Sequence, residues 1–273
     1  MAEQGFGERS FAHGGATRAV FDKGPGLPVL VLHELPGLAQ ACVDFADRLV
    51  AAGFHVYLPL LVGRPLQDAA LCNLRRLCIS AEFARLKAGE HAPVTDWLRA
   101  LAGDISRRHG GHKVGGIGMC MTGAFVIPLV IDPWVAAGVV SQPSIPFSIP
   151  YRVAGLGAGP WMRQLNISDE QLQEAVDAAR SQDKALLVQH FADDRLCPRE
   201  RIERIAAAFG AQAEVHAYEE PSRLRRLFDP PHALLTEEYD RAGDADHATR
   251  VALQRVVAFL RQHLGAPAQQ ADP

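Results

Sequence analysis

The stretch KVGGIGMCMTGA, at residues 113–124, is the strongest indication of the fold in this sequence. An apolar run at residues 114–117 reaches Gly118, and a second apolar segment begins at Ala124, so a buried strand turns sharply into a helix. Cys120 lies at the corner. Small residues flank such a corner because strand and helix pass closely there. The pattern predicts a nucleophile elbow, a strained turn that lifts a reactive side chain clear of the sheet.

Two features keep a second interpretation of this stretch open. Thr122 stands two residues after the cysteine, where a G-x-C-x-G elbow has glycine. A buried cysteine in a strand is also a common core residue. The choice between a nucleophile and a core thiol therefore depends on which side chains the rest of the chain brings to Cys120.

Strand-like and helix-like segments alternate on both sides of the elbow. Apolar runs lie at residues 28–32, 54–61, 136–141, 185–191 and 213–218, and helical spacing at residues 39–52, 95–108, 168–180, 199–209 and 248–264. Residues 5–22 suit edge strands, and a helix is expected within residues 68–79. The alternation predicts an α/β fold with a mostly parallel central sheet flanked by helices on both faces.

The length and composition are those of one globular unit. The chain has 273 residues, of which 48% are hydrophobic and 22% are charged. We expect a single domain over residues 1–265 and a disordered tail over residues 266–273. Residues 143–180 begin with a stretch rich in proline and glycine, which indicates a loop insertion or a small cap.

Charge and cysteine usage exclude several classes of protein. The net charge of −3 gives no electrostatic footprint for nucleic acid. The five cysteines are odd in number and lack CxxC spacing, which argues against a disulfide framework or a zinc site and favours a reducing cytoplasm. The N-terminus has no apolar signal segment, and Pro128, Asp132 and Pro133 interrupt the longest apolar run. We therefore expect a cytoplasmic protein without a membrane partner.

Chemically capable side chains follow several of the predicted strands. Glu34, Cys120, the pair Asp193 and Asp194, and His232 in a late loop all have this placement, and ligands bind at the carboxyl ends of parallel strands. A cysteine attacks as thiolate and needs a base, which in turn needs an acid to orient it. Because α/β-hydrolases carry nucleophile, acid and histidine in this chain order, the sequence predicts a Cys120, Asp194 and His232 triad.

Alternatives exist for the acid and for the base. Asp194 begins the pattern DRLCP, which leads into a helix, whereas Asp193 suits a turn or helix-cap contact. His247 competes with His232, although it also suits the first turn of the final helix. His33 is expected to be a structural hydrogen-bonding residue.

An oxyanion formed during acyl transfer needs backbone donors. The elbow supplies the N–H of Met121, and the loop after residues 28–32 supplies that of Leu35. Glu34, in the same loop, either modulates the thiol or is a buried acid that pairs with an arginine.

Taken together, these stretches resemble the dienelactone hydrolase family of α/β-hydrolases. The similar segments are VLVLHELPGL, DFADRL, GFHVYLPL, GIGMCMTG, FADDRLCP, PPHALL and AFLRQHL, which cover most of residues 28–264. The resemblance implies an α/β-hydrolase fold with Cys120, Asp194 and His232 as the triad. It also implies that Glu34 contacts the resting thiol and that the reaction uses no cofactor.

Three departures from the family pattern affect the expected substrate. Thr122 replaces the usual glycine, and the interval from Cys120 to Asp194 is longer than usual, with the excess expected within residues 146–180. Thr236 stands where the family has an arginine that helps to hold a substrate carboxylate. The activity class is expected to survive these changes better than the family's named substrate does.

The sequence therefore predicts a hydrolase of small-molecule esters, lactones or thioesters, with neither metal nor cofactor. One alternative is a hydrolase-like fold without catalysis that serves as a small-molecule binding or regulatory protein; Thr122 and the missing arginine favour it. Another is a thiol redox sensor, which needs a resolving cysteine near Cys120, and nothing in the sequence brings Cys42 or Cys197 there.

Overall fold

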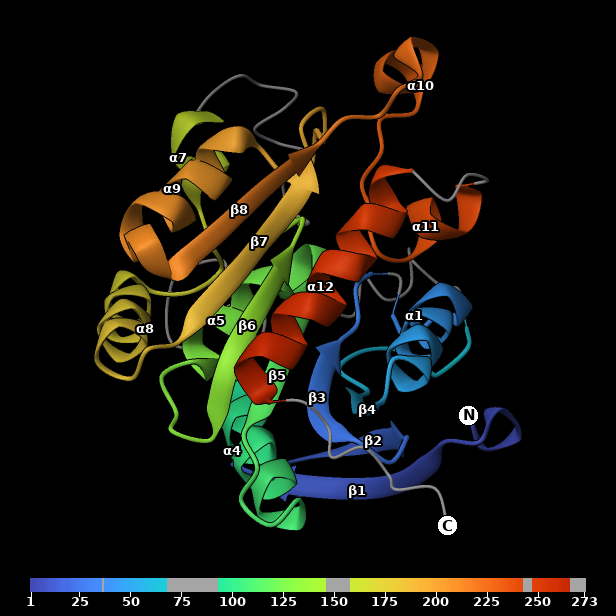
Figure 1. Ribbon diagram of the computed structural model, residues 1–273, viewed down its shortest axis with the longest axis vertical. Coiled ribbons are helices and arrows are strands. Elements are labelled where there is room, and N and C mark those ends of the chain that lie inside the picture. The colour runs from blue at the N-terminus through green and yellow to red at the C-terminus, as the bar shows by residue number, and fades with distance from the viewer. Residues whose placement is uncertain (36, 68–92, 146–157, 243–246, 266–273) are drawn as a thin grey trace.

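The elbow strand, β5 (Val114–Met119), lies inside an eight-stranded sheet of order β1-β2-β4-β3-β5-β6-β7-β8 in this computed structural model (Figure 1). The structure describes residues 1–35, 37–67, 93–145, 158–242 and 247–265. Every residue of β5 is buried, as expected of a strand covered on both faces.

The sheet is antiparallel at one edge and parallel elsewhere. β1 pairs antiparallel with β2, β2 pairs antiparallel with β4, and all other neighbours pair in parallel. The remaining strands are β1 (Gly7–His13), β2 (Ala16–Lys23), β3 (Leu27–Leu32), β4 (Phe54–Pro59), β6 (Val135–Ser141), β7 (Ala185–Phe191) and β8 (Ala213–Tyr218). The predicted mostly parallel α/β sheet is confirmed, including the edge strands at the N-terminus.

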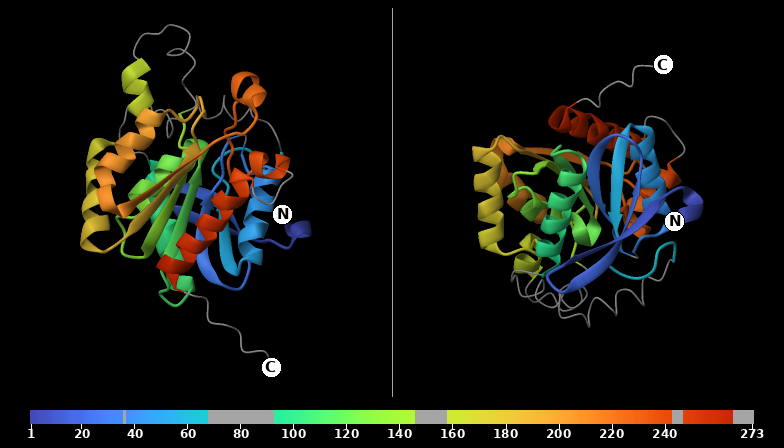
Figure 2. Two further views of the ribbon diagram at one scale, coloured as in Figure 1. Left: turned by 45° about the horizontal axis from the view of Figure 1, so that its top comes forward. Right: turned by 90° about the horizontal axis from the view of Figure 1, so that it is seen from below.

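Helices pack on both faces of this sheet (Figures 1 and 2). One apolar layer joins the sheet to α1 (Gln40–Ala51) and α12 (Ala248–Leu264). The other layer joins it to α4 (Pro93–Arg108), α5 (Val126–Leu129), α8 (Asp169–Ser181) and α9 (Arg199–Phe209). Ser168 and Gln171 form a capping box at the start of α8.

Several short elements were not predicted from the sequence. The segment after the elbow is a 3-10 helix, η2 (Cys120–Phe125), followed by the single turn of α5, rather than the one continuous helix that was expected after the strand. Others are η1 (Ala2–Gln4), α7 (Ala158–Arg163), η3 (Gly210–Gln212), α10 (Arg223–Phe228) and α11 (Glu237–Arg241). These pieces are too short for apolar periodicity to indicate them.

Some predictions fall outside the described residues, namely the helix within residues 68–79 and the tail at residues 266–273. Much of the proline-rich stretch after residue 145 lies there as well. Among the described helices, none has the length and apolar character needed to cross a bilayer.

Candidate active site

Cys120 occupies a strained corner at the carboxyl end of β5. Its φ of 54° lies in the left-handed region, which a residue with a side chain rarely adopts. A Cβ at Gly118 would lie 2.4 Å from the carbonyl oxygen of Thr122, and one at Gly123 would lie 2.9 Å from Cα of Pro143. Only glycine fits at both positions, so the turn has the geometry of a nucleophile elbow.

Thr122, the departure from the elbow pattern, has a structural role in this turn. Its side chain is fully buried. Thr122 Oγ1 accepts the N–H of Met119 at 3.2 Å and lies 3.1 Å from the carbonyl oxygen of Leu32, to which it can donate. The hydroxyl therefore connects the elbow to the end of β3, where the loop with Glu34 and Leu35 begins.

The acid and the histidine meet beyond the ends of β7 and β8. Asp194 Oδ2 lies 2.6 Å from Nδ1 of His232. The other oxygen, Oδ1, accepts the backbone N–H groups of Leu196 at 2.8 Å and Cys197 at 3.2 Å. The Asp194 side chain is 1% exposed, so these contacts hold its carboxylate in one orientation and fix the tautomer of the imidazole.

His232 also interacts electrostatically with Cys120, and its other ring nitrogen is Nε2. It is buried and makes no hydrogen bond of normal geometry among the described residues. Burial alone lowers the pKa of His232, but Cys120 and Asp194 outweigh burial and hold that pKa well above the usual 6.5. The structure thus brings Cys120, Asp194 and His232 together.

The rival residues lie elsewhere. Asp193 is exposed and forms a long ion pair of 3.8 Å with Arg226. His247 is the N-cap of α12, where its Nδ1 accepts the N–H of Thr249 at 3.3 Å. His33 is buried between two backbone groups: Nε2 accepts the N–H of Leu61 and Nδ1 bonds to the carbonyl oxygen of Glu34, each at 3.0 Å.

Glu34 is buried close to the histidine and has polar but uncharged hydrogen-bonding partners. Thr236 donates to Oε1, and Gln142 Nε2 donates to Oε2 at 3.5 Å. Burial raises the pKa of Glu34, whereas the hydrogen bond from Thr236 and the nearby His232 lower it. Of the hydrogen bonds between described residues, those of the Glu34 carboxylate go to Thr236 and Gln142 rather than to Cys120.

The sulfur of Cys120 is instead hydrogen-bonded to Ser144, a residue that sequence reasoning missed. The distance between Sγ and Oγ is 3.0 Å. Ser144 lies just beyond β6, in the segment Ser-Gln-Pro-Ser, residues 141–144. Polar residues directly after a fully buried strand were the available signal, because the ends of parallel strands meet at one edge of a sheet.

Arg201, at the start of α9, was missed as well. It is 1% exposed, and its guanidinium donates to the carbonyl oxygens of Gln164, Pro143, Leu196 and Trp161 at 2.6–3.0 Å. Burial lowers its pKa to about 10. A single side chain therefore connects the loop carrying Ser144, the loop carrying Asp194 and the C-terminal end of α7.

The other described cysteines have a different environment. Burial raises the pKa of Cys42, and it raises that of Cys197 well above the usual range. Both thiols are therefore held in the neutral form. Cys197 nevertheless interacts electrostatically with Cys120, a proximity that the sequence did not indicate.

The two expected oxyanion donors lie on the same side of the sheet. Met121 is the second residue of η2, where backbone N–H groups lack partners within the helix. Leu35 is partly buried and packs on the apolar layer that contains Met121. An oxyanion hole requires two such N–H groups on one side of the nucleophile.

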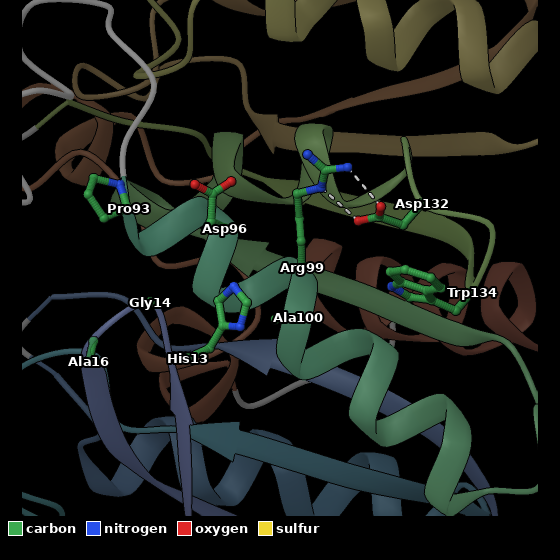
Figure 3. A pocket seen from close by; sticks show the side chains of 9 residues that line it. All are labelled: His13, Gly14, Ala16, Pro93, Asp96, Arg99, Ala100, Asp132 and Trp134. Atoms are coloured by element: carbon green, nitrogen blue, oxygen red, sulfur yellow. Dashed lines mark hydrogen bonds and ion pairs between the residues drawn. The ribbon is translucent and has the colours of Figure 1, made fainter.

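A separate pocket of about 450 Å³ lies between the β1–β2 turn and α4 (Figure 3). It is lined by His13, Gly14, Ala16, Pro93, Asp96, Arg99, Ala100, Asp132 and Trp134. Arg99 and Asp132 form a two-pronged ion pair with both distances 2.7 Å, which raises the pKa of Arg99. None of the site residues predicted from the sequence lines this pocket. Among the described residues, no cluster of metal-ligating side chains occurs, in this pocket or outside it.

Known structures with the same architecture define the class. A proposed dienelactone hydrolase from Klebsiella pneumoniae is 20% identical, with a TM-score of 0.61 over 94% of this chain and 98% of that chain. A dienelactone hydrolase-like promiscuous phosphotriesterase from metagenomic libraries is 16% identical, with a TM-score of 0.61 over 95% and 98%. The esterase domain of a Rhodothermus marinus protein is 14% identical, with a TM-score of 0.59 over 95% and 99%. The fold is that of the α/β-hydrolases.

The family follows from the sequence itself. The profile of the dienelactone hydrolase family matches residues 16–264. The chain belongs to this family, as the resemblance in its motifs indicated, and is a hydrolase of the dienelactone hydrolase type. A search of curated proteins gives no match.

Proposed function

We propose that this protein is a cofactor-independent hydrolase that cleaves a small ester, lactone or thioester through Cys120. His232, oriented by Asp194, takes the thiol proton, and the sulfur attacks the substrate carbonyl. The amides of Leu35 and Met121 hold the oxyanion. His232 then protonates the leaving group and activates the water that releases the acyl group.

The observation that carries this proposal is the left-handed corner at Cys120 together with the hydrogen bond between Asp194 and His232. The corner has a φ of 54°, and the carboxylate and the imidazole are 2.6 Å apart. Backbone strain of this kind persists where the surrounding structure over-determines it, which is typical of reactive residues. A core cysteine requires neither the strain nor an oriented histidine.

Substitution of the sulfur tests the proposal. We expect Cys120→Ala to reduce kcat/KM by on the order of 10⁴-fold or more on a panel of p-nitrophenyl esters, small lactones and thioesters. Cys42→Ala is the matched control, because Cys42 is a buried cysteine on α1, in the apolar layer on the other face of the sheet from that of Cys120. The control is expected to retain activity.

Full esterase activity in a folded Cys120→Ala variant would contradict the assignment. A thiol-directed ester probe separates catalysis from simple binding of a small molecule. A hydrolase is expected to be labelled at Cys120 in preference to the other cysteines, whereas a binding protein without catalysis gives no such preference.

A further inference from the structure

Cys120 and Ser144 are joined twice, through their side chains and through their backbones. Sγ and Oγ are 3.0 Å apart, and the N–H of Ser144 donates to the carbonyl oxygen of Cys120 at 2.9 Å. Both residues are buried, with exposed fractions of 8% for Cys120 and 6% for Ser144. Water therefore competes little for the contact between sulfur and hydroxyl.

The loop that carries Ser144 is held from two other parts of the site. Arg201 donates to the carbonyl oxygen of Pro143 at 3.0 Å, and Asn166 Nδ2 donates to that of Ser144 at 3.5 Å. Asn166 is itself buried and has a φ of 58°. The position of the hydroxyl is thus fixed by α9 and by the segment before α8, which is the preorganisation that catalytic donors require.

A serine hydroxyl can adapt to both forms of the sulfur. It can accept a hydrogen bond from a thiol, and by rotation it can donate one to a thiolate, which can only accept. A hydrogen bond to the charged form of a group favours that form. The contact therefore assists formation of the nucleophile without adding a charge.

Three titratable groups act electrostatically on Cys120 from neighbouring segments: His232, Cys197 and Arg201. Arg201 is occupied by four backbone carbonyl groups, and Cys197 is held as a neutral thiol by burial. His232 is the group that accepts the proton. Among the described residues, Ser144 therefore provides the neutral hydroxyl group that is hydrogen-bonded to the sulfur itself.

We propose that Ser144 is a further catalytic residue, whose hydroxyl donates a hydrogen bond to the thiolate of Cys120; this role rests on the proposed function of the site. The thiol proton passes from Sγ to Nε2 of His232, the bonding electron pair stays on sulfur, and Ser144 keeps its own proton. Its hydrogen bond weakens again as the sulfur becomes a thioester, which has no charge to stabilise.

The pH dependence of alkylation of Cys120 by iodoacetamide tests this role without any need for turnover. The modified peptide is quantified by mass spectrometry in the full-length protein. We expect Ser144→Ala to move the midpoint of the rate profile upward by about one pH unit, equivalent to about tenfold less thiolate below the midpoint. Ser144→Gly is a second variant without the hydroxyl, and Ser144→Thr is expected to retain the wild-type midpoint.

Ser106→Ala is the matched control, because Ser106 on α4 is equally buried at 6% exposure. It is expected to leave the profile unchanged, and circular dichroism checks the fold of each variant. A folded Ser144→Ala or Ser144→Gly protein with the wild-type midpoint would overturn the proposal, as would a Thr variant shifted as far as Ala. If the wild type hydrolyses none of the panel while the shift is still observed, the proposed function fails and the role of Ser144 in activating the thiol stands.

Discussion

Two histidine loops at the carboxyl end of the sheet, that of buried His33 and that of partly buried His232, have opposite electrostatic environments. In the loop after β3, His33 bonds only to backbone groups, and burial lowers its pKa to about 4. In the loop before α11, His232 contacts Asp194 and lies near Cys120, which hold its pKa well above 6.5. The difference shows that the ionisable partner, rather than burial or placement at a strand end, makes an imidazole suitable as a base.

The largest effect is expected from removing the charge that distinguishes the two loops. Asp194→Asn leaves the shape of the side chain but favours the wrong tautomer of His232, so we expect kcat to fall by about 10⁴-fold. Steady-state kinetics on the best ester of the panel measures this fall. Asp193→Asn is the matched control and is expected to be nearly silent, because Asp193 is exposed and pairs weakly with Arg226. Equal losses in both variants would remove the distinction between the two acids.

A smaller effect is expected on the pH dependence of the free energy of unfolding, to which His33 contributes. Because its folded-state pKa is about 4 and its unfolded value about 6.5, the unfolded chain binds the extra proton between these pH values. The free energy of unfolding therefore rises with pH across this window, and His33 contributes about 3 kcal/mol to the rise.

His33→Gln removes this titration. We expect urea unfolding from pH 4 to 6.5 to show a correspondingly shallower pH dependence in the variant, with the hydrolytic activity at neutral pH largely retained. A variant that keeps the full wild-type slope would show that His33 is not the group responsible.

The sequence predicted the scaffold of the site better than its surroundings. Burial imposes a visible pattern of apolar residues on long strands and amphipathic helices. For this reason β7, β8, α9 and α12 were predicted with the bounds that the structure shows. Cys120 and Glu34 were placed at strand ends by the same logic. The choice of Asp194 over Asp193 followed only from the residues after it, and in the structure it is Asp194 that contacts His232.

The contacts that could not be predicted depend on tertiary packing. Ser144 reaches the sulfur because Arg201, from a helix much later in the chain, holds the preceding proline carbonyl. Thr236, in place of the family arginine, donates to buried Glu34, whereas the sequence offered an arginine partner for that acid. Short helices such as α10 and α11 are set by local hydrogen bonds, which leave little periodicity in the sequence.

The most direct test of the account is the NMR titration of the His232 imidazole in the wild type and in Cys120→Ala, with His232→Gln used to assign the signal. We expect a pKa of His232 well above 6.5 in the wild type, because the sulfur and Asp194 both favour the imidazolium. In Cys120→Ala we expect the pKa of His232 to fall by about one unit or more, because burial is then opposed by Asp194 alone. An unchanged His232 titration in the folded variant would contradict the claim that sulfur, imidazole and carboxylate act as one unit.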